Sequence, residues 1–130
     1  MAIAGLGTDI VQLSRIERSL TRSPKLAERV LTPTELSDFI GHAEPARFLA
    51  KRFAAKEAAA KALGTGFSGG LSLQHIAVVH DAHGRPLLSF HGHAASFCLA
   101  HGVGESHLSI SDEQDYAIAF VTLTRGTSSP

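Results

Sequence analysis

Two carboxylates, Asp9 and Glu57, are the residues whose type and surroundings are best suited to catalysis. Asp9 follows two glycines near the N-terminus, and Glu57 lies between Lys56 and Lys61 in an alanine-rich segment. Mg²⁺ prefers hard oxygen ligands and often takes one or two carboxylates, with water and substrate phosphate as its other ligands. The lysines and the amides of Gly64-Thr65-Gly66 are suited to hold those phosphates. The residues alone therefore predict metal-assisted phosphate chemistry, if Asp9 and Glu57 meet in the fold.

Several common catalytic patterns are missing from the chain. It has no GxSxG nucleophile motif, no Walker A phosphate loop, and no GxGxxG fingerprint after its first predicted strand. It has no HExxH or Cys/His zinc pattern, and its single cysteine, Cys98, excludes an internal disulfide framework. Most of the eight histidines are expected at turns and strand surfaces, but His107 shares a strand face with two serines.

The predicted chemistry depends on a helix expected over residues 47–66. Alanine dominates its middle and no β-branched residue interrupts it, so its intrinsic helix propensity is high. Pro45 stands where a first helical turn tolerates proline. Gly64 or Gly66 suits the left-handed conformation in which many helices end.

The charges of this helix allow two interpretations. Lys56 falls in the middle of an apolar arc, with Arg52 and Glu57 at its edges. In the first, Lys56 extends past its apolar neighbours, and Glu57 forms a surface pair with Lys61 worth about 0.2–0.5 kcal/mol. In the second, the helix lines a polar site in which Glu57 faces a cation and the lysines face phosphate.

Residues 3–11 are predicted to form a short strand. Alternation places Ile3, Gly5, Gly7 and Asp9 on one face. The two glycines leave open space there, so something can approach the backbone closely. The alternative role for Asp9 is a cap or turn at the end of the strand.

Three short helices are expected after this strand. Ser14–Glu17 and Thr32–Glu35 fit capping boxes, and Ser23-Pro24 opens the helix between them. Three arginines recur at spacings of three and four on the first helix and so share a face: Arg15, Arg18 and Arg22. That face is either only solvated or a docking surface for an acidic protein partner.

The second half of the chain is predicted to alternate strands with one helix. Strands are expected over 73–80, 87–90, 107–111 and 116–124, and a helix over 93–101. Short helices grouped between strands predict an α+β fold with a mainly antiparallel sheet. With no repeat and no linker, residues 1–130 form one domain, and residues 125–130 are expected to be a frayed tail.

Composition limits the classes of partner. The 130 residues are 44% hydrophobic and 18% charged with zero net charge, which fits a globular domain. No stretch approaches the roughly 20 apolar residues of a membrane helix, and no basic leader precedes the first apolar run, so we expect a soluble cytoplasmic protein. Residues 1–66 hold ten Lys/Arg and seven Asp/Glu, and with one Tyr and no Trp the chain gives little support for nucleic acid.

Three motifs resemble a known family across nearly the whole chain. GLGTDIVQLSRIE, RFLAKRFAAKEAAAKALGTG and HLSIS are similar, in order and spacing, to the short bacterial 4′-phosphopantetheinyl transferases known as holo-[acyl-carrier-protein] synthases. The resemblance implies transfer of 4′-phosphopantetheine from coenzyme A to a serine of apo acyl carrier protein, leaving adenosine 3′,5′-bisphosphate. It also implies the 4′-phosphopantetheinyl transferase fold and a role in fatty acid biosynthesis.

The resemblance implies roles for particular residues. Asp9 and Glu57 match the Mg²⁺ ligands, and together with Lys61, which matches a pyrophosphate contact, they form the catalytic set. Arg15 matches a carrier-docking arginine, with Arg18 and Arg22 beside it. The implied coenzyme-binding set is Arg52, Lys56, Lys61, Gly64, Thr65 and Gly66. One departure is Asp112, where many relatives have histidine.

Family members are trimers with each active site between two subunits, so a homotrimer is implied. The alternative function is a non-catalytic trimer that binds coenzyme A or a carrier protein without turnover. A third hypothesis, a metal-dependent phosphohydrolase acting on coenzyme A, would give product without a carrier.

Overall fold

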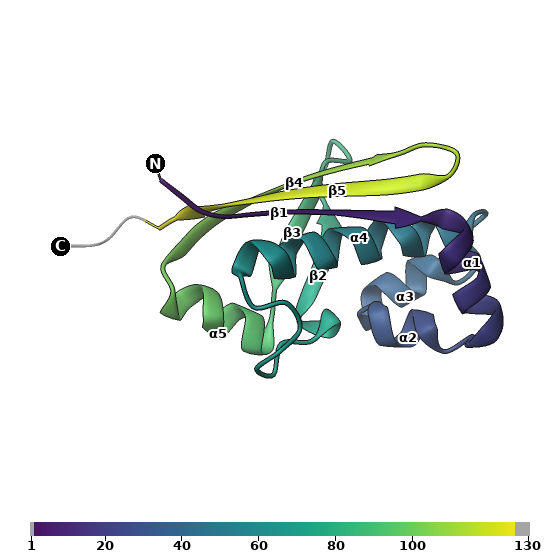
Figure 1. The fold of residues 1–130 in the computed structure, drawn as a ribbon, viewed down its shortest axis with the longest axis horizontal. Helices are drawn as coiled ribbons and strands as arrows, with labels where there is room; N and C mark the ends of the chain where they lie inside the picture. Colours follow the sequence, from purple (N-terminus) through teal and green to yellow (C-terminus); the bar gives the residue numbers. More distant parts are fainter. Residues whose placement is uncertain (1, 127–130) are drawn as a thin grey trace.

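The computed structural model describes residues 2–126, which form two antiparallel sheets and a set of helices around one long central helix (Figure 1). The strands are β1 (Ile3–Gln12), β2 (Ile76–His80), β3 (Pro86–Phe90), β4 (Val103–Asp112) and β5 (Tyr116–Arg125). The helices are α1 (Leu13–Arg22), α2 (Leu26–Val30), α3 (Pro33–Phe39), α4 (Pro45–Leu63), the short 3₁₀ helix η1 (Leu73–His75) and α5 (Gly92–Ala100).

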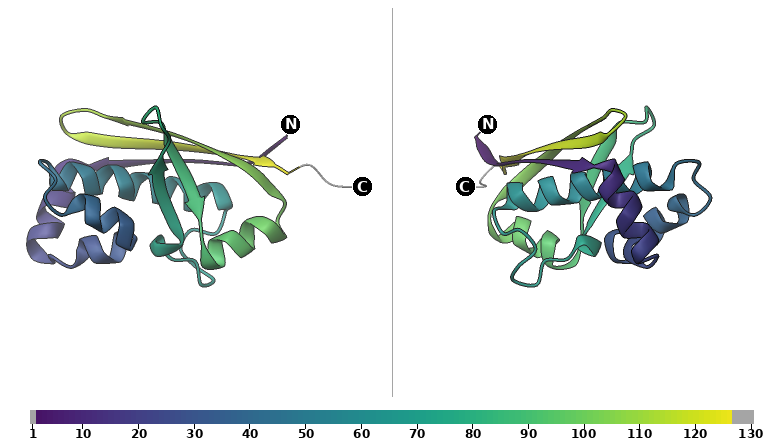
Figure 2. Two further views of the ribbon diagram at one scale, coloured as in Figure 1. Left: turned by 180° about the vertical axis from the view of Figure 1, so that it is seen from behind. Right: turned by 45° about the vertical axis from the view of Figure 1, so that its right-hand side comes forward.

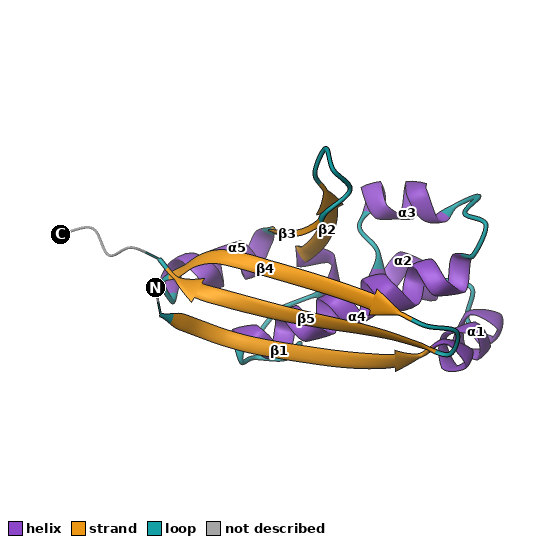
Figure 3. Ribbon diagram, turned by 90° about the horizontal axis from the view of Figure 1, so that it is seen from above, coloured by secondary structure: helices purple, strands orange, loops and turns teal. Residues whose placement is uncertain are grey.

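The larger sheet has the order β1-β5-β4, with both pairs antiparallel. It forms one layer, and α4 runs beneath it (Figure 3). The smaller sheet is the β2–β3 hairpin, which stands beside α4 (Figure 2). This confirms the predicted α+β class with an antiparallel sheet against a long helix.

Helix α4 is enclosed along most of its length, which explains its alanine content. The sheet covers one side and the short helices cover another, so its buried positions need small side chains. The helix begins with Pro45 and ends at Gly64, whose φ of 85° is the predicted left-handed conformation. The sequence therefore predicted this element nearly to its ends.

The glycine face of β1 is packed against α4 rather than open. A Cβ added to Gly5 would overlap the carbonyl of Ala62, and one added to Gly7 would overlap that of Ala58. The prediction of open space beside Asp9 is therefore wrong. The group that approaches the strand so closely is the protein's own helix.

The short helices begin in different ways, with or without a capping side chain. The predicted capping box at α3 is present: Thr32 Oγ1 accepts from the Glu35 amide at 3.4 Å, and Glu35 Oε1 accepts from the Thr32 amide at 2.9 Å. The box predicted at Ser14–Glu17 is wrong, because α1 begins at Leu13 without a side-chain cap. Helix α2 begins at Leu26, after the predicted Ser23-Pro24 start.

The remaining elements agree with expectation apart from their ends. The first part of the predicted strand 73–80 is η1, and β4 is longer than expected because it starts at Val103. Arg125 ends β5 and donates its amide to the Ala2 carbonyl, so residues 125 and 126 are not frayed. Residues 127–130 of the predicted tail lie outside the described residues.

The face of the larger sheet turned away from α4 is apolar and uncovered. Its large exposed side chains are Leu6, Ile10, Tyr116, Ile118 and Phe120. A contiguous exposed apolar patch of large side chains often marks a surface that contacts a partner. Within residues 2–126, no helix is long and apolar enough to cross a membrane.

Candidate active site

Asp9 and Glu57 line the same cavity, as the predicted chemistry requires. The cavity has a volume of about 320 Å³ and lies between the end of β1, helix α1 and the middle of α4. Its other lining residues are Ile10, Val11, Gln12, Arg15, Ile16, Ser19, Leu26, Val30, Leu49 and Phe53. A few polar groups from β1, α1 and α4 therefore meet in a mostly apolar hollow, which is typical of ligand sites.

Asp9 is oriented by Lys61. The Lys61 Nζ donates to Asp9 Oδ1 at 3.1 Å and to the Thr8 carbonyl at 3.0 Å, which ties β1 to the last turns of α4. The Lys61 side chain is 53% exposed and that of Asp9 is 17% exposed. Lys61 thus lies beside Asp9 with about half of its side chain exposed to an incoming anion.

The Glu57 carboxyl is held in an unfavourable environment for its ionised form. Burial raises its pKa above the ordinary 4.5, the negative charge of Asp9 raises it further, and Lys61 partly opposes both. Two carboxylates that repel each other in a half-buried site are stabilised when a cation binds between them.

This donor set suits one class of metal. In the described part of the chain, no group of three or more His, Cys, Asp or Glu side chains is placed to hold a metal ion. Two carboxylates alone do not suit Zn²⁺, whose sites use several nitrogen or sulfur ligands. They do suit Mg²⁺, which keeps waters and takes substrate phosphate oxygens. Asp9 and Glu57 are the residues that could hold it.

The three arginines of α1 divide between two places. Arg15 lines the cavity with Asp9 and Glu57. Arg18 and Arg22 line a separate shallow hollow further along the helix. All three are exposed, so the predicted basic face exists, and only its first member adjoins the carboxylates.

The predicted phosphate loop continues directly from α4. Gly64 and Gly66 both have positive φ, and Thr65 Oγ1 donates to the Gly66 carbonyl at 2.9 Å. Thr65 lines a small hollow of its own with residues of α5, such as Phe97, and the loop does not line the Asp9–Glu57 cavity. Its contact with a coenzyme stays a prediction.

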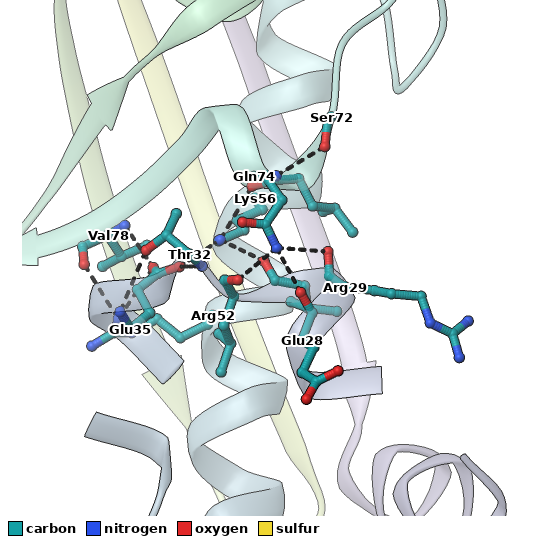
Figure 4. Close-up of polar contacts among 12 residues, drawn as sticks. Glu28, Arg29, Thr32, Glu35, Arg52, Lys56, Ser72, Gln74 and Val78 are labelled. Atoms are coloured by element: carbon teal, nitrogen blue, oxygen red, sulfur yellow. Dashed lines mark hydrogen bonds and ion pairs between the residues drawn. The ribbon is translucent and has the colours of Figure 1, made fainter. Parts of the chain in front are cut away.

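Lys56 is placed differently from the prediction. Its side chain is fully buried, and its ammonium donates to Glu35 Oε1 at 2.6 Å, to the Val30 carbonyl at 2.6 Å and to the Leu73 carbonyl at 3.2 Å (Figure 4). An ammonium has three donors, and all three are used inside the fold. The predictions that Lys56 faces phosphate, or extends to solvent, are therefore both wrong.

Arg52 belongs to the same buried cluster. Its NH1 donates to Glu35 Oε2 and to the Val78 carbonyl, each at 3.2 Å, and its guanidinium lies 4.5 Å from the centre of the Phe48 ring. It also lines a second cavity, of about 670 Å³, between α3 and the β2–β3 hairpin. A phosphate contact by Arg52 stays a prediction, but Arg52 does not line the cavity of Asp9 and Glu57.

Glu35 is the central residue that sequence reasoning missed. It is 2% exposed and accepts from Lys56, Arg52, and the amides of Thr32 and Val78. Burial alone would raise its pKa, but the hydrogen bond from Lys56 and those backbone amides lower it below the ordinary 4.5. The capping box explained Glu35 by local structure, so nothing signalled its distant partners.

Two other polar positions have structural partners. Asp112, the departure from the family pattern, accepts from Arg47 NH1 at 2.9 Å. His107 lies on the exposed face of β4, with Nε2 3.4 Å from Glu105 Oε2. Neither lines the cavity of the two carboxylates.

Comparison with known proteins gives consistent matches. A profile of the 4′-phosphopantetheinyl transferase superfamily matches residues 5–121. The holo-[acyl-carrier-protein] synthase of Halorhodospira halophila is 57% identical over 125 residues, covering 95% of this chain and 99% of that protein. The crystal structure of the Neisseria meningitidis holo-[acyl-carrier-protein] synthase has a TM-score of 0.88 and 46% identity, covering 95% of this chain and 99% of that one. The Bacillus anthracis synthase in complex with CoA (3′,5′-ADP) has a TM-score of 0.81 and 37% identity, covering 97% of this chain and 100% of that one.

Proposed function

Because the chain belongs to the 4′-phosphopantetheinyl transferase superfamily and is an enzyme of the holo-[acyl-carrier-protein] synthase type, we propose that it modifies acyl carrier protein for fatty acid biosynthesis. It transfers 4′-phosphopantetheine from coenzyme A to a serine of the apo carrier, in a Mg²⁺-dependent reaction that releases adenosine 3′,5′-bisphosphate. The observation that carries this proposal is the convergence of Asp9 and Glu57 in one cavity, beside Lys61 and Arg15. A cytoplasmic location belongs to the same proposal.

The chemical step is a displacement at the β-phosphorus of coenzyme A. The carrier serine oxygen forms the new bond to phosphorus, and the bond to the departing bisphosphate breaks. The serine proton passes either to Glu57 or to a water held at the metal site. Lys61, half exposed beside Asp9, stabilises the negative charge of the leaving bisphosphate.

Asp9 and Glu57 are the residues that hold Mg²⁺ in this proposal. Burial raises the pKa of Glu57 and the charge of Asp9 raises it further, and a cation between the two carboxylates would offset both effects, which supports the assignment. When bound, Mg²⁺ supplies positive charge to the phosphate oxygens. Lys61 keeps Asp9 oriented towards the cavity in the absence of the ion.

Substrate binding divides between the two ends of the site. The Gly64, Thr65 and Gly66 amides extend the phosphate contacts from Lys61 along the coenzyme, because the loop follows the end of α4 directly. On the other side, the exposed arginines of α1 receive the acidic carrier protein.

A homotrimer with sites between subunits is part of the proposal. The uncovered apolar face of the larger sheet supports it, since Phe120 and Ile118 would otherwise stay half exposed at the centre of that face. Arg52 reaches the second cavity rather than the first. A phosphate contact by Arg52 would therefore be made outside the first cavity.

Intact-mass spectrometry tests the proposed function directly. An apo acyl carrier protein is incubated with this enzyme, coenzyme A and Mg²⁺, and the expected product is heavier by one phosphopantetheine group. Chelation of the metal is expected to prevent the gain. Product released from coenzyme A without any carrier would instead indicate a phosphohydrolase, and coenzyme binding with no product would indicate a binder.

Three variants make the test specific to the site. Asp9→Asn and Glu57→Gln are expected to abolish transfer while the fold is retained, as judged by circular dichroism. Glu28→Gln is the matched control, because Glu28 is an exposed acid on α2 outside the cavity. Full activity in both site variants would refute the metal assignment.

A further inference from the structure

One arginine of another element contacts three successive residues at the turn between β4 and β5. Arg47, in the first turn of α4, donates from NH1 to Asp112 Oδ2 at 2.9 Å and to the Glu113 carbonyl at 2.6 Å, and from NH2 to the Gln114 carbonyl at 3.3 Å. A planar guanidinium can satisfy several acceptors in a fixed geometry, which an ammonium cannot. Arg47 therefore joins the turn to α4 at three points.

The same turn contacts the start of α1. The Asp115 carbonyl accepts from the Leu13 amide at 2.8 Å, and Leu13 is the first residue of α1. Gln12, which precedes the helix, provides no side-chain cap. The turn thus satisfies one of the unpaired amides that every helix start presents, in place of a local cap.

The start of α1 is also one wall of the catalytic cavity. Gln12 and Arg15 line the cavity with Asp9 and Glu57, and Arg15 follows the Leu13 amide by two residues. A shift at the first turn of α1 would move Arg15 relative to both carboxylates. The Leu13–Asp115 hydrogen bond therefore links the start of α1 to the turn that Arg47 contacts.

We propose that Arg47 is a positioning residue for the carrier-docking helix. By holding residues 112–114, next to Asp115, it fixes the start of α1 and so the position of Arg15 relative to the Asp9–Glu57 pair. The inference rests on the proposed function, in which Arg15 contacts the carrier. Arg47 itself contacts no substrate in this role.

Kinetics of Arg47→Met test the proposal, because methionine keeps most of the apolar stem and removes the donors. The carrier KM is expected to rise about five- to tenfold, with the coenzyme A KM within about twofold of the parent. Lys51→Ala is the matched control. Lys51 lies on the same helix with Nζ 4.0 Å from Asp112 Oδ1, but it contacts no carbonyl of the turn, so its loss should change neither KM.

A double-mutant cycle separates positioning from direct contact or general damage. If Arg47 acts through Arg15, Arg47→Met should add little to the carrier KM in an Arg15→Ala background. Fully additive effects, or equal rises in both KM values, would overturn the proposal.

Amide hydrogen exchange supplies a readout that needs no activity. Arg47→Met is expected to speed exchange of the Leu13 amide at least about tenfold and to leave buried α4 amides, such as that of Ala59, unchanged. Unchanged Leu13 exchange would refute the positioning role. If the parent protein shows no transfer to carrier, the proposed function fails, and this measurement still decides whether Arg47 holds α1.

Discussion

Glu57 is the residue whose titration best reports the geometry of the site. Its pKa is raised chiefly by burial and then by the charge of Asp9, with Lys61 in opposition. Asp9→Asn is therefore expected to lower the pKa of Glu57, and Lys61→Met to raise it. A carboxyl-carbon NMR titration measures both.

Added Mg²⁺ should also lower the pKa of Glu57, because the cation favours the ionised form. The exposed Glu28 carboxyl is the internal control for non-specific ionic effects. If neither substitution moves the titration of Glu57, the two carboxylates do not share a site.

A second single residue, Glu35, contributes to the stability of the fold through its negative charge. Glu35→Gln leaves the buried Lys56 ammonium without its counter-charge, so we expect a loss of about 3–5 kcal/mol in the free energy of unfolding at pH 7. The folded-state pKa of Glu35 is depressed, so its contribution is complete above the unfolded value and disappears as the pH falls through the folded one. Urea denaturation of parent and variant should therefore give converging stabilities below about pH 4.

Asp38→Asn is the matched control for this prediction. Asp38 lies on the same helix as Glu35 but is exposed, so its substitution should change stability little. A Glu35→Gln variant as stable as Asp38→Asn at neutral pH would show that the buried pair contributes no net charge stabilisation.

Among the elements, the contact between β1 and α4 is the most sensitive to added volume. Gly7→Ala would place a methyl group against the backbone of Ala58, and a backbone carbonyl cannot rotate away as a flexible side chain can. We expect a loss of about 1–3 kcal/mol, with displacement of the neighbouring Asp9 from Glu57 and hence lower activity.

Thermal unfolding and transfer kinetics check the effect of Gly7→Ala. Ser37→Ala is the control, since Ser37 is exposed on α3, outside the strands and the cavity, and the change is equally small. An unaltered melting temperature with full activity would mean that α4 does not approach β1 as closely as described.

The elements also show which kinds of signal can be read from the sequence. Helix α4 and the capping box of α3 were predictable because proline, alanine, glycine and the Thr32–Glu35 pair act locally. The start of α1 was not, because Leu13 obtains its acceptor from Asp115, which is distant in the chain. The open face predicted beside Gly5 and Gly7 failed for the same reason, since its occupant is a distant helix.

The candidate site likewise divides into residues that local sequence signals could predict and residues whose roles depend on distant contacts. Asp9 and Glu57 were predicted from their residue types and their neighbouring glycines and lysines, and the structure places both in one cavity, but their roles stay predictions. Lys56 was misassigned because a buried lysine with three internal acceptors gives the same sequence pattern as a phosphate-binding one. Only the position of Glu35 in the fold distinguishes a buried, ion-paired lysine from a phosphate-binding lysine.

For the whole molecule, the uncovered face of the larger sheet makes assembly the main question. We expect a particle of about three times the 13.7 kDa chain mass in light scattering after size-exclusion chromatography. Phe120→Glu should give a folded monomer with little activity, because a charge in the middle of that face opposes association.

Leu99→Glu is the control for this substitution. Leu99 is 86% exposed on α5, away from the sheet, so the same apolar-to-acidic change there should leave the assembly intact. A monomeric parent protein would refute the trimer, and a trimeric Phe120→Glu variant would show that the contacts lie elsewhere.

The acceptors around Lys56 have a consequence for the order in which the chain folds. Its ammonium contacts residues 30, 35 and 73, so the cluster closes only when segments on both sides of α4 have docked. Such contacts are costly in loop-closure entropy and are expected to form after the rate-limiting barrier. Lys56→Met should therefore accelerate unfolding and leave the refolding rate nearly unchanged in stopped-flow chevron measurements. A matching decrease in the refolding rate would instead place this cluster in the folding nucleus.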